Sequence, residues 1–162
     1  MLMSVAAVAE NSVIGYLNRI PWPFIKEDMD HFRSLTLGHT VVMGRNTCQS
    51  LKNPLKNRTN IVITRDKAYD RHGFITVNNP NKVIEIGETS DVYIIGGQEI
   101  YSLFLPFVDL MYITKIKLNP MGDVFYPEFK EEEWNVEVEL DKYNLAFLTY
   151  RRQSPSFLKK DI

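Results

Sequence analysis

The stretch that decides the fold is residues 2–9, LMSVAAVA, a nearly unbroken apolar run that ends at Glu10-Asn11. A strand without polar alternation suits the interior of a largely parallel sheet that is covered on both faces. We therefore predict that this segment is a central strand. Similar short apolar strands are expected at residues 40–43 (TVVM), 60–64 (NIVIT) and 91–95 (DVYII).

The segments between these runs predict helices and further strands. Residues 26–37 form a helix that places Met29, Phe32 and Leu35 or Thr36 on one face. The other expected helices are residues 47–51, 80–86 and 98–105, and the other expected strands are residues 74–77 and 110–118 with a hairpin of 134–140 and 145–151.

The order of these elements predicts one α/β domain. Its central, mostly parallel twisted sheet would have about eight strands and end in a C-terminal antiparallel hairpin, and about four helices would flank it. We expect the domain to cover residues 1–153 and to be followed by a flexible C-terminal tail, residues 154–162.

Composition restricts the kinds of partner. The net charge of −1 and the scattered Lys and Arg residues argue against nucleic acid and an anionic membrane. The single cysteine, Cys48, excludes an internal disulfide and suits a reducing cytosol, while His31, His39 and His72 have no metal-ligand spacing. The N-terminal run is too short, and lacks the basic flank, for a signal peptide or a membrane span. We expect a cytoplasmic protein with a small-molecule partner and no metal.

Residues 13–32 (VIGYLNRIPWPFIKEDMDHF) join a loop that carries Trp22 to a helix that carries Asp28. Gly15 and the two prolines predict that the loop contains no regular element. An aspartate in the first turn of a helix is usually a solvated charge that the helix dipole favours. Asp28 nevertheless lies at the edge of the apolar face, four residues before Phe32, so it can point towards whatever that face covers.

Two predicted strands are followed at once by glycine and a helix. Gly44-Arg45-Asn46-Thr47 and Gly96-Gly97 occupy these junctions, and Thr64-Arg65 closes a third strand. Backbone N–H groups and arginines at such strand ends would hold a phosphate, and two junctions in one sheet converge on one crevice. Gly44 could equally serve only to make the turn, and Arg45 could be solvated. The G-x-G-x-x-G and P-loop motifs are absent.

Together these residues resemble the dihydrofolate reductase family over residues 2 to about 152. The motifs that carry the resemblance are Ala6-Ala7, Val13-Ile14-Gly15, Pro21-Trp22, Asp28 with Phe32, Val42-Met43-Gly44-Arg45-Asn46-Thr47, Pro54-Leu55, Arg58-Thr59-Asn60, Ile95-Gly96-Gly97, Tyr101, Phe104-Leu105-Pro106, Thr114, Gly122-Asp123 and Pro127. Each motif is weak alone, but their order and spacing are specific.

The resemblance implies reduction of 7,8-dihydrofolate to 5,6,7,8-tetrahydrofolate by hydride transfer from NADPH, in support of one-carbon metabolism. It places Asp28 as the carboxylate of the pterin pocket, hydrogen-bonded to Thr114, with Trp22 as the third catalytic residue. Glu27 is adjacent, but Asp28 is in helical phase with Phe32. Asp28 is expected to have a raised pKa because of its apolar surroundings. The resemblance also implies a cytoplasmic monomer that antifolates inhibit.

The resemblance assigns two further groups of residues. The substrate would contact Ala6, Ala7, Met29, Phe32, Leu51, Leu55, Arg58, Ile95 and Tyr101, with Arg58 paired to the α-carboxylate of the glutamate tail. NADPH would contact Ala7, Ile14, Gly15, Gly44, Arg45, Asn46, Thr47, Thr64, Arg65, Gly96, Gly97, Gln98, Glu99 and Ile100. Arg45, Thr64 and Arg65 would take the 2′-phosphate, and Gly96-Gly97 would be a cis peptide. Gln98, Cys48, Ile20 and Pro23 depart from common family residues.

Two other readings remain. The pyrimidine reductase of riboflavin synthesis resembles this fold and uses NADPH, but it would not need Trp22, Asp28 and Arg58 together. A nucleotide-binding module without catalytic activity would not need Asp28 and Thr114.

Overall fold

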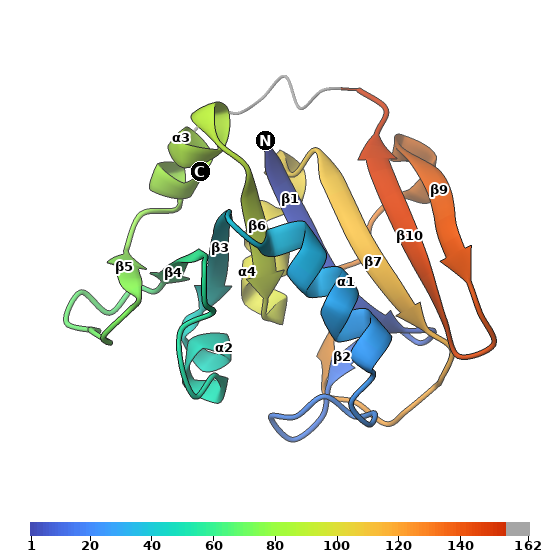
Figure 1. The fold of residues 1–162 in the computed structure, drawn as a ribbon. Helices are drawn as coiled ribbons and strands as arrows, with labels where there is room; N and C mark the ends of the chain where they lie inside the picture. The colour runs from blue at the N-terminus through green and yellow to red at the C-terminus, as the bar shows by residue number, and fades with distance from the viewer. Residues whose placement is uncertain (155–162) are drawn as a thin grey trace.

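The structure is a computed structural model that describes residues 1–154, and its centre is an eight-stranded sheet (Figure 1). The strand order is β5-β4-β3-β6-β1-β7-β10-β9. The strands are β1 (Leu2–Ala9), β3 (Thr40–Gly44), β4 (Thr59–Ile63), β5 (Ile75–Val77), β6 (Val92–Gly96), β7 (Leu110–Ile116), β9 (Trp134–Asp141) and β10 (Leu145–Arg152). The predicted tail lies, from residue 155 onwards, outside the described residues.

Strand β1 occupies the middle of the sheet, as its apolar sequence predicts. It pairs in parallel with both β6 and β7. Leu2, Ala6 and Val8 pack into the hydrophobic cluster on one face, while Met3 and Val5 pack into the cluster on the other. All the pairs from β5 to β7 are parallel, and β10 and β9 add the predicted antiparallel edge. The predicted fold class is confirmed.

Four α-helices cover the two faces of the sheet. They are α1 (Lys26–Thr36), α2 (Arg45–Ser50), α3 (Pro80–Thr89) and α4 (Gln98–Phe104), and two short 3-10 turns, η1 (Leu105–Phe107) and η2 (Glu131–Glu133), follow elsewhere. Phe32 and Cys48 place α1 and α2 on one face, and Val83 and Phe104 place α3 and α4 on the other. Figure 1 shows α1 crossing in front of the sheet and α4 behind it. Within the described residues, no helix is long and apolar enough to cross a membrane.

Two helices depart from their predicted bounds by more than one residue. Helix α2 begins at Arg45, two residues earlier than expected, because Gly44 ends β3 with extended backbone and is itself the N-cap. Helix α3 continues to Thr89, three residues beyond the predicted end, because Val83, Ile84 and Gly87 keep one face buried against the sheet. A sequence pattern predicts the ends of a helix only to within a few residues.

A two-stranded ribbon was not predicted. β2 (Val13–Gly15) pairs with β8 (Val124–Phe125), so the expectation that the segment around Gly15 contains no regular element was wrong. Strands of three and two residues are too short to show a period in sequence. Gly122 lets the two segments approach, because a Cβ there would lie 2.2 Å from Val13 Cγ1. The ribbon anchors the loop that leads into α1.

Candidate active site

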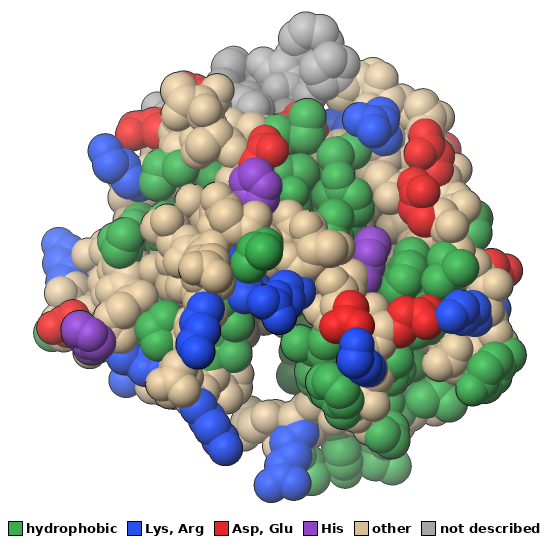
Figure 2. Space-filling model, in the orientation of Figure 1, with side chains coloured by type: hydrophobic (Ala, Val, Ile, Leu, Met, Phe, Trp, Pro, Cys, Tyr) green, Lys and Arg blue, Asp and Glu red, His purple; other side chains and the backbone are tan. Residues whose placement is uncertain are grey.

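A pocket of about 250 Å³ opens between the loop before α1 and the first turn of that helix. Its lining residues are Ile20, Trp22, Pro23, Phe24, Ile25, Asp28 and Met29. Figure 2 shows the molecule hollowed between the side that carries this loop and the side that carries α2, near the carboxyl end of β6. Hydrophobic side chains border the hollow on the α1 side, and Lys and Arg side chains border it on the other. Ligands of open α/β sheets bind at such carboxyl ends.

Asp28 provides the carboxyl group of this pocket. Its side chain is half-buried and hydrogen-bonds the hydroxyl of Thr114, which lies buried on β7. Thr114 is opposite Ala7 in the parallel pairing of β7 with β1. Burial raises the pKa of Asp28, and the Thr114 hydroxyl and the charge of His31 oppose that rise. The site therefore holds a carboxyl group that takes up a proton more readily than an exposed aspartate.

The neighbouring carboxylate, Glu27, has a different environment. Its Oε2 accepts a hydrogen bond of 2.6 Å from Lys142 Nζ, in the turn between β9 and β10. Its Oε1 is buried and has no hydrogen-bond partner among residues 1–154. Glu27 thus ties α1 to the C-terminal hairpin, whereas Asp28 lines the pocket.

His31 is a site residue that the sequence reasoning missed. Its ring stacks on Phe147 of β10, with the centroids 4.0 Å apart and an interplanar angle of 15°. Burial lowers the pKa of His31, and the charges of Asp28 and Glu139 oppose that change. The available signal was spacing, because a residue three positions after Asp28 lies on the same side of the helix.

The wall beneath the pocket combines the loop and the sheet. Trp22 and Ala7 pack against a small cluster formed by Ile116, Leu145 and Phe147. Ala6 points to the opposite face of the sheet, so only its backbone is close to this wall. Tyr101 also lies on that opposite face, where it is buried and its hydroxyl donates to Val5 O at 2.8 Å. The Ala6 side chain therefore lies on the face of the sheet opposite Trp22. Burial, Tyr126 and the charge of Asp28 raise the pKa of Tyr101, so the Tyr101 hydroxyl lies within electrostatic reach of the Asp28 carboxyl group.

The predicted benzoyl region lies along α1 and the end of α2. Phe32, Leu51, Leu55 and Ile95 are partly buried and pack against the same hydrophobic cluster. Arg58 closes this region, because its Nη1 donates to Thr36 Oγ1 at 3.2 Å and its Nε donates to Lys56 O at 2.9 Å. The pKa of Arg58 is lowered, first by burial and then by the nearby charge of Arg33.

The two strand–glycine–helix junctions meet, as the sequence predicts. A Cβ on Gly44 would lie 2.9 Å from Ile100 Cγ1, and a Cβ on Gly97 would lie 3.7 Å from Thr47 Oγ1. The Gly96-Gly97 peptide is cis, and Gly96 has a φ of +122°, which favours glycine. The junctions form one cradle at the carboxyl ends of β3 and β6, in which Gly44 and Gly96 are buried and Gly97 is half-buried.

The remaining predicted cofactor residues are placed as follows. Asn46, Arg65 and Glu99 are exposed, Thr47 and Thr64 are half-buried, Ile14 packs against the core and Gly15 ends β2. Gln98 Oε1 accepts a hydrogen bond of 2.8 Å from Phe125 N. The side-chain oxygen of Gln98 is therefore directed to the β2–β8 ribbon.

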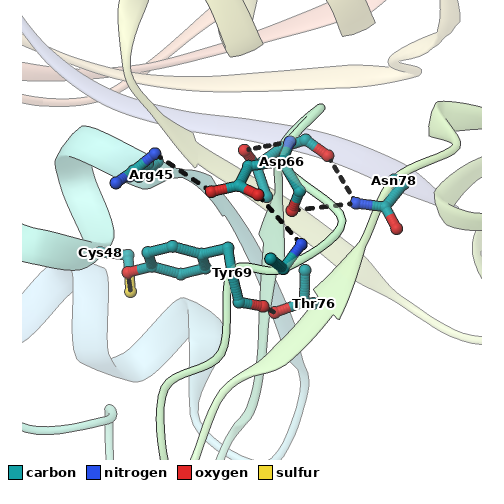
Figure 3. A network of polar contacts seen from close by, with 8 residues as sticks. Arg45, Cys48, Asp66, Tyr69, Thr76 and Asn78 are labelled. Atoms are coloured by element: carbon teal, nitrogen blue, oxygen red, sulfur yellow. Dashed lines mark hydrogen bonds and ion pairs between the residues drawn. The ribbon is translucent and has the colours of Figure 1, made fainter.

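Arg45 lies in a polar network at the start of α2 (Figure 3). Its Nη1 is 3.5 Å from Asp66 Oδ2, and its guanidinium carbon is 5.1 Å from the centre of the Tyr69 ring. Tyr69 in turn hydrogen-bonds Cys48 Sγ at 3.3 Å, which raises the pKa of Tyr69. Among the described residues, no group of three or more His, Cys, Asp and Glu side chains is arranged to hold a metal ion.

Comparison with known proteins places the chain among close relatives. The family model for dihydrofolate reductase matches residues 1–152. The chain is 32% identical to the dihydrofolate reductase of Bacillus subtilis (strain 168), over 96% of this chain and 97% of that protein. It is 37% identical to the enzyme of Staphylococcus aureus (strain Mu50 / ATCC 700699), over 82% of this chain and 84% of that protein. A solved structure of dihydrofolate reductase from Enterococcus faecalis, complexed with NADP(H) and RAB-propyl, superposes with a TM-score of 0.86 at 27% identity and covers 95% of this chain and 97% of that chain.

The sheet, the cleft and these relatives define an NADPH-dependent oxidoreductase with one α/β sheet. The chain belongs to the dihydrofolate reductase family. Its reaction is the reduction of 7,8-dihydrofolate with NADPH, and a pyrimidine reductase of riboflavin synthesis is not favoured.

Proposed function

We propose that dihydrofolate reduction by this chain is centred on Asp28. The observation that carries the proposal is a half-buried carboxyl group with a raised pKa, hydrogen-bonded to Thr114 and lining an otherwise apolar pocket. A carboxylate in that position can accept hydrogen bonds from the amino edge of the pterin. Its raised pKa suits it to favour protonation of pterin N5 through a tautomer or a water molecule. Trp22 would shield this exchange from bulk solvent, since it lines the pocket beside Asp28 and packs against the same cluster as Ala7.

The cradle of Gly44 and Gly96-Gly97 fits the cofactor. A side chain at Gly44 would collide with Ile100, and one at Gly96 would approach Tyr101 to 3.3 Å, so neither position has room for a side chain. When bound, NADPH supplies the hydride that pterin C6 accepts. Ala7, Ile14, Gly15 and the first residues of α2 and α4 would hold its nicotinamide and pyrophosphate, and Arg45, Thr64 and Arg65 its 2′-phosphate. Arg45 fits that role because its guanidinium is half-exposed, at 48% of its side-chain surface.

The remaining assignments concern the substrate. Met29 and Phe32 would hold the pterin and the benzoyl ring, together with Leu51, Leu55 and Ile95. Arg58 would pair with the α-carboxylate of the glutamate tail. The contacts of Arg58 with Thr36 and Lys56 fix its guanidinium before substrate arrives. Ala6 would act through its backbone, and Tyr101 through its hydroxyl, which donates to Val5 O.

We also propose that residues 1–153 are one reductase domain and that the protein is a cytoplasmic monomer that binds antifolates. The single buried cysteine suits a reducing compartment. The same apolar pocket and Asp28 carboxyl group would receive the protonated ring of an inhibitor.

The test is loss of nicotinamide absorbance with dihydrofolate, run first with NADPH and then with NADH, with identification of tetrahydrofolate as the product. Asp28→Asn should lower kcat/KM roughly 100-fold or more, because it removes a group that exchanges protons. Asp30→Asn is the matched control, since Asp30 is exposed on the same helix and pairs with Lys26. Equal activity of the two variants would remove Asp28 from the centre of the reaction, and no turnover of dihydrofolate by the unaltered protein would overturn the proposed function itself.

A further inference from the structure

The proposed 2′-phosphate site contains an acidic residue that the assigned function does not require. Asp66 Oδ2 lies 3.5 Å from Arg45 Nη1, and both side chains are about half-exposed. Figure 3 shows the two charged groups directed towards one another beside the N-terminus of α2. An anion site normally presents cations and hydrogen-bond donors, so a carboxylate on its arginine needs an explanation.

The carboxylate of Asp66 is held in place by its own turn. Asp66 Oδ1 accepts a hydrogen bond of 2.9 Å from Ala68 N, and Asp66 N donates to Thr64 Oγ1 at 3.2 Å. Asn78 Nδ2 donates to Thr64 O at 2.9 Å and to Asp66 O at 3.4 Å. Because these contacts define the backbone from Thr64 to Ala68, the position of the carboxylate is a fixed feature of the turn.

Arg45 is also positioned from its other side. Its guanidinium lies over the Tyr69 ring, and Tyr69 is held by Cys48 and by Thr76, whose hydroxyl donates to Tyr69 O at 2.9 Å. Tyr69 can therefore keep Arg45 near the site when the ion pair with Asp66 is broken. Half-exposed ion pairs contribute little to stability, so breaking this pair costs little. The negative charge of Asp66 nevertheless stays beside any anion that replaces it.

We propose that Asp66 is a specificity-determining positioning residue that competes with the cofactor 2′-phosphate for Arg45 and so reduces the preference of the enzyme for NADPH over NADH. The inference rests on the proposed function, in which Arg45 binds that phosphate. Asp66 neutralises Arg45 in the free protein and repels the incoming dianion. NADH carries no 2′-phosphate and meets neither effect.

The decisive variant is Asp66→Asn, which removes the charge and keeps an oxygen that can accept from Ala68 N. It should tighten the Kd of NADPH and of the fragment 2′,5′-ADP by roughly fivefold, which is the upper range for one exposed charge pair. The Kd values of NADH and 5′-AMP should not change. The gain should shrink at low pH, where the phosphate loses its second charge with a pKa of about 6.

Three comparisons separate this effect from a general change in structure or charge. Glu85→Gln removes a carboxylate from the exposed Glu85–Lys82 pair and should change neither Kd. In an Arg45→Gln background, Asp66→Asn should tighten NADPH binding less, because the competition for Arg45 is gone and only the direct repulsion of the phosphate by Asp66 remains to be removed. Asp66→Ser, whose hydroxyl can also form the turn, should reproduce the selective gain if the charge is responsible.

The outcomes are distinct when calorimetry measures binding directly. Selective tightening of the two phosphate-bearing ligands supports the inference. Equal changes for NADPH and NADH, no change, or weaker NADPH binding in both Asp66 variants would overturn it while leaving the proposed cofactor in place. If the unaltered protein binds no NADPH, the proposed function fails, and the inference fails with it.

Discussion

The proton affinity of Asp28 has a consequence for stability. Its pKa is raised in the folded protein, first by burial, so the folded state binds the proton more tightly than the unfolded state does. The stability that Asp28 contributes is therefore complete below its unfolded pKa of about 4 and is lost as the pH rises through the folded value. At neutral pH the ionised carboxylate destabilises the fold.

Asp28→Asn should therefore melt at a higher temperature than the unaltered protein at pH 7, although it is less active. The difference in Tm should decrease towards zero below pH 4 or so, where the aspartate is also neutral. Thermal melts across this pH range check the expectation. A lower Tm at pH 7 would mean that ionised Asp28 stabilises the fold through contacts other than those described.

Thr114 lowers the pKa of Asp28 and so opposes the effect of burial. Its hydroxyl favours the ionised form of Asp28, so Thr114→Val should raise the pKa of Asp28 further. The pH profile of kcat/KM should shift to higher pH, with a loss of roughly tenfold or more in the neutral range. Valine has nearly the same shape, so the fold should persist in a far-ultraviolet circular dichroism control. An unshifted profile would show that the hydroxyl does not act on Asp28.

The direction of a single side chain could be predicted from sequence where the residue lies in a helix or strand with a clear hydrophobic period. The choice of Asp28 over Glu27 rested on helical phase with Phe32, and the structure directs the two carboxylates to different surroundings. His31 was missed because its stacking partner, Phe147, is distant in sequence. Strand pairing determines which residues meet across the sheet, and the local sequence pattern does not predict that pairing.

At the scale of elements, α2 depends on a residue outside it. Arg71 donates to Cys48 O, to Leu51 O at 2.6 Å and to Lys52 O at 3.1 Å, and so satisfies the carbonyl groups at the helix C-terminus. Its guanidinium carbon also lies 4.7 Å from the centre of the Phe74 ring. The Arg71 side chain thus holds the C-terminus of α2, the helix that begins with Arg45.

Arg71→Ala should destabilise the protein by about 2 kcal/mol, as expected for lost hydrogen bonds to a charged group. Because α2 carries Arg45 and Thr47, the KM for NADPH should rise more than the KM for dihydrofolate. Chemical denaturation and steady-state kinetics measure the two effects, and Arg19→Ala, a change in the exposed loop that precedes α1, controls for loss of an arginine. Unchanged stability would mean that the helix end is solvated equally well without Arg71.

The elements with a continuous apolar run or a clear helical period were the predictable ones. The strands β1, β3, β4 and β6 follow from apolar runs, because a strand covered on both faces excludes polar residues. The β2–β8 ribbon could not be predicted, since its two strands pair across more than a hundred residues and owe their contact to Gly122. The predicted end of α4 was within one residue of the observed end, because Pro106 stops the helix after Phe104. The chain continues there as the 3-10 turn η1.

On the scale of the whole molecule, the cleft separates the side of α1 from the side of α2 (Figure 2). A ligand that spans the cleft binds only the folded chain and therefore stabilises it by mass action. NADPH at about 100 times its Kd should add about 2.7 kcal/mol to the free energy of unfolding and raise Tm by roughly 5 to 10 °C. Differential scanning fluorimetry with increasing NADPH measures the shift, and adenosine serves as the control. No shift at saturation would contradict binding across the cleft.

The fold class was predictable from the order of apolar segments, whereas the order of strands in the sheet was not. Two parallel strands can be adjacent or separated by another strand with the same local sequence, and only packing of the complete core selects the arrangement. The placement of β1 between β6 and β7, which brings Ala7 beside Thr114, is a property of the assembled sheet.

Helix α1 contacts the C-terminal hairpin through the stacking of His31 on Phe147 and the ion pair of Glu27 with Lys142. These contacts can form only after the hairpin has been synthesised. The pocket begins in α1, which precedes the other helices of this domain in the chain, yet part of its wall belongs to β9 and β10, which follow every other strand of the sheet. Since domains are synthesised N-terminus first, the surroundings of Asp28 are complete only after β10 has been synthesised. A nascent chain that ends before β10 would carry the Asp28 carboxyl group in water, with an ordinary acidity, and would complete the pocket only once β10 has been synthesised.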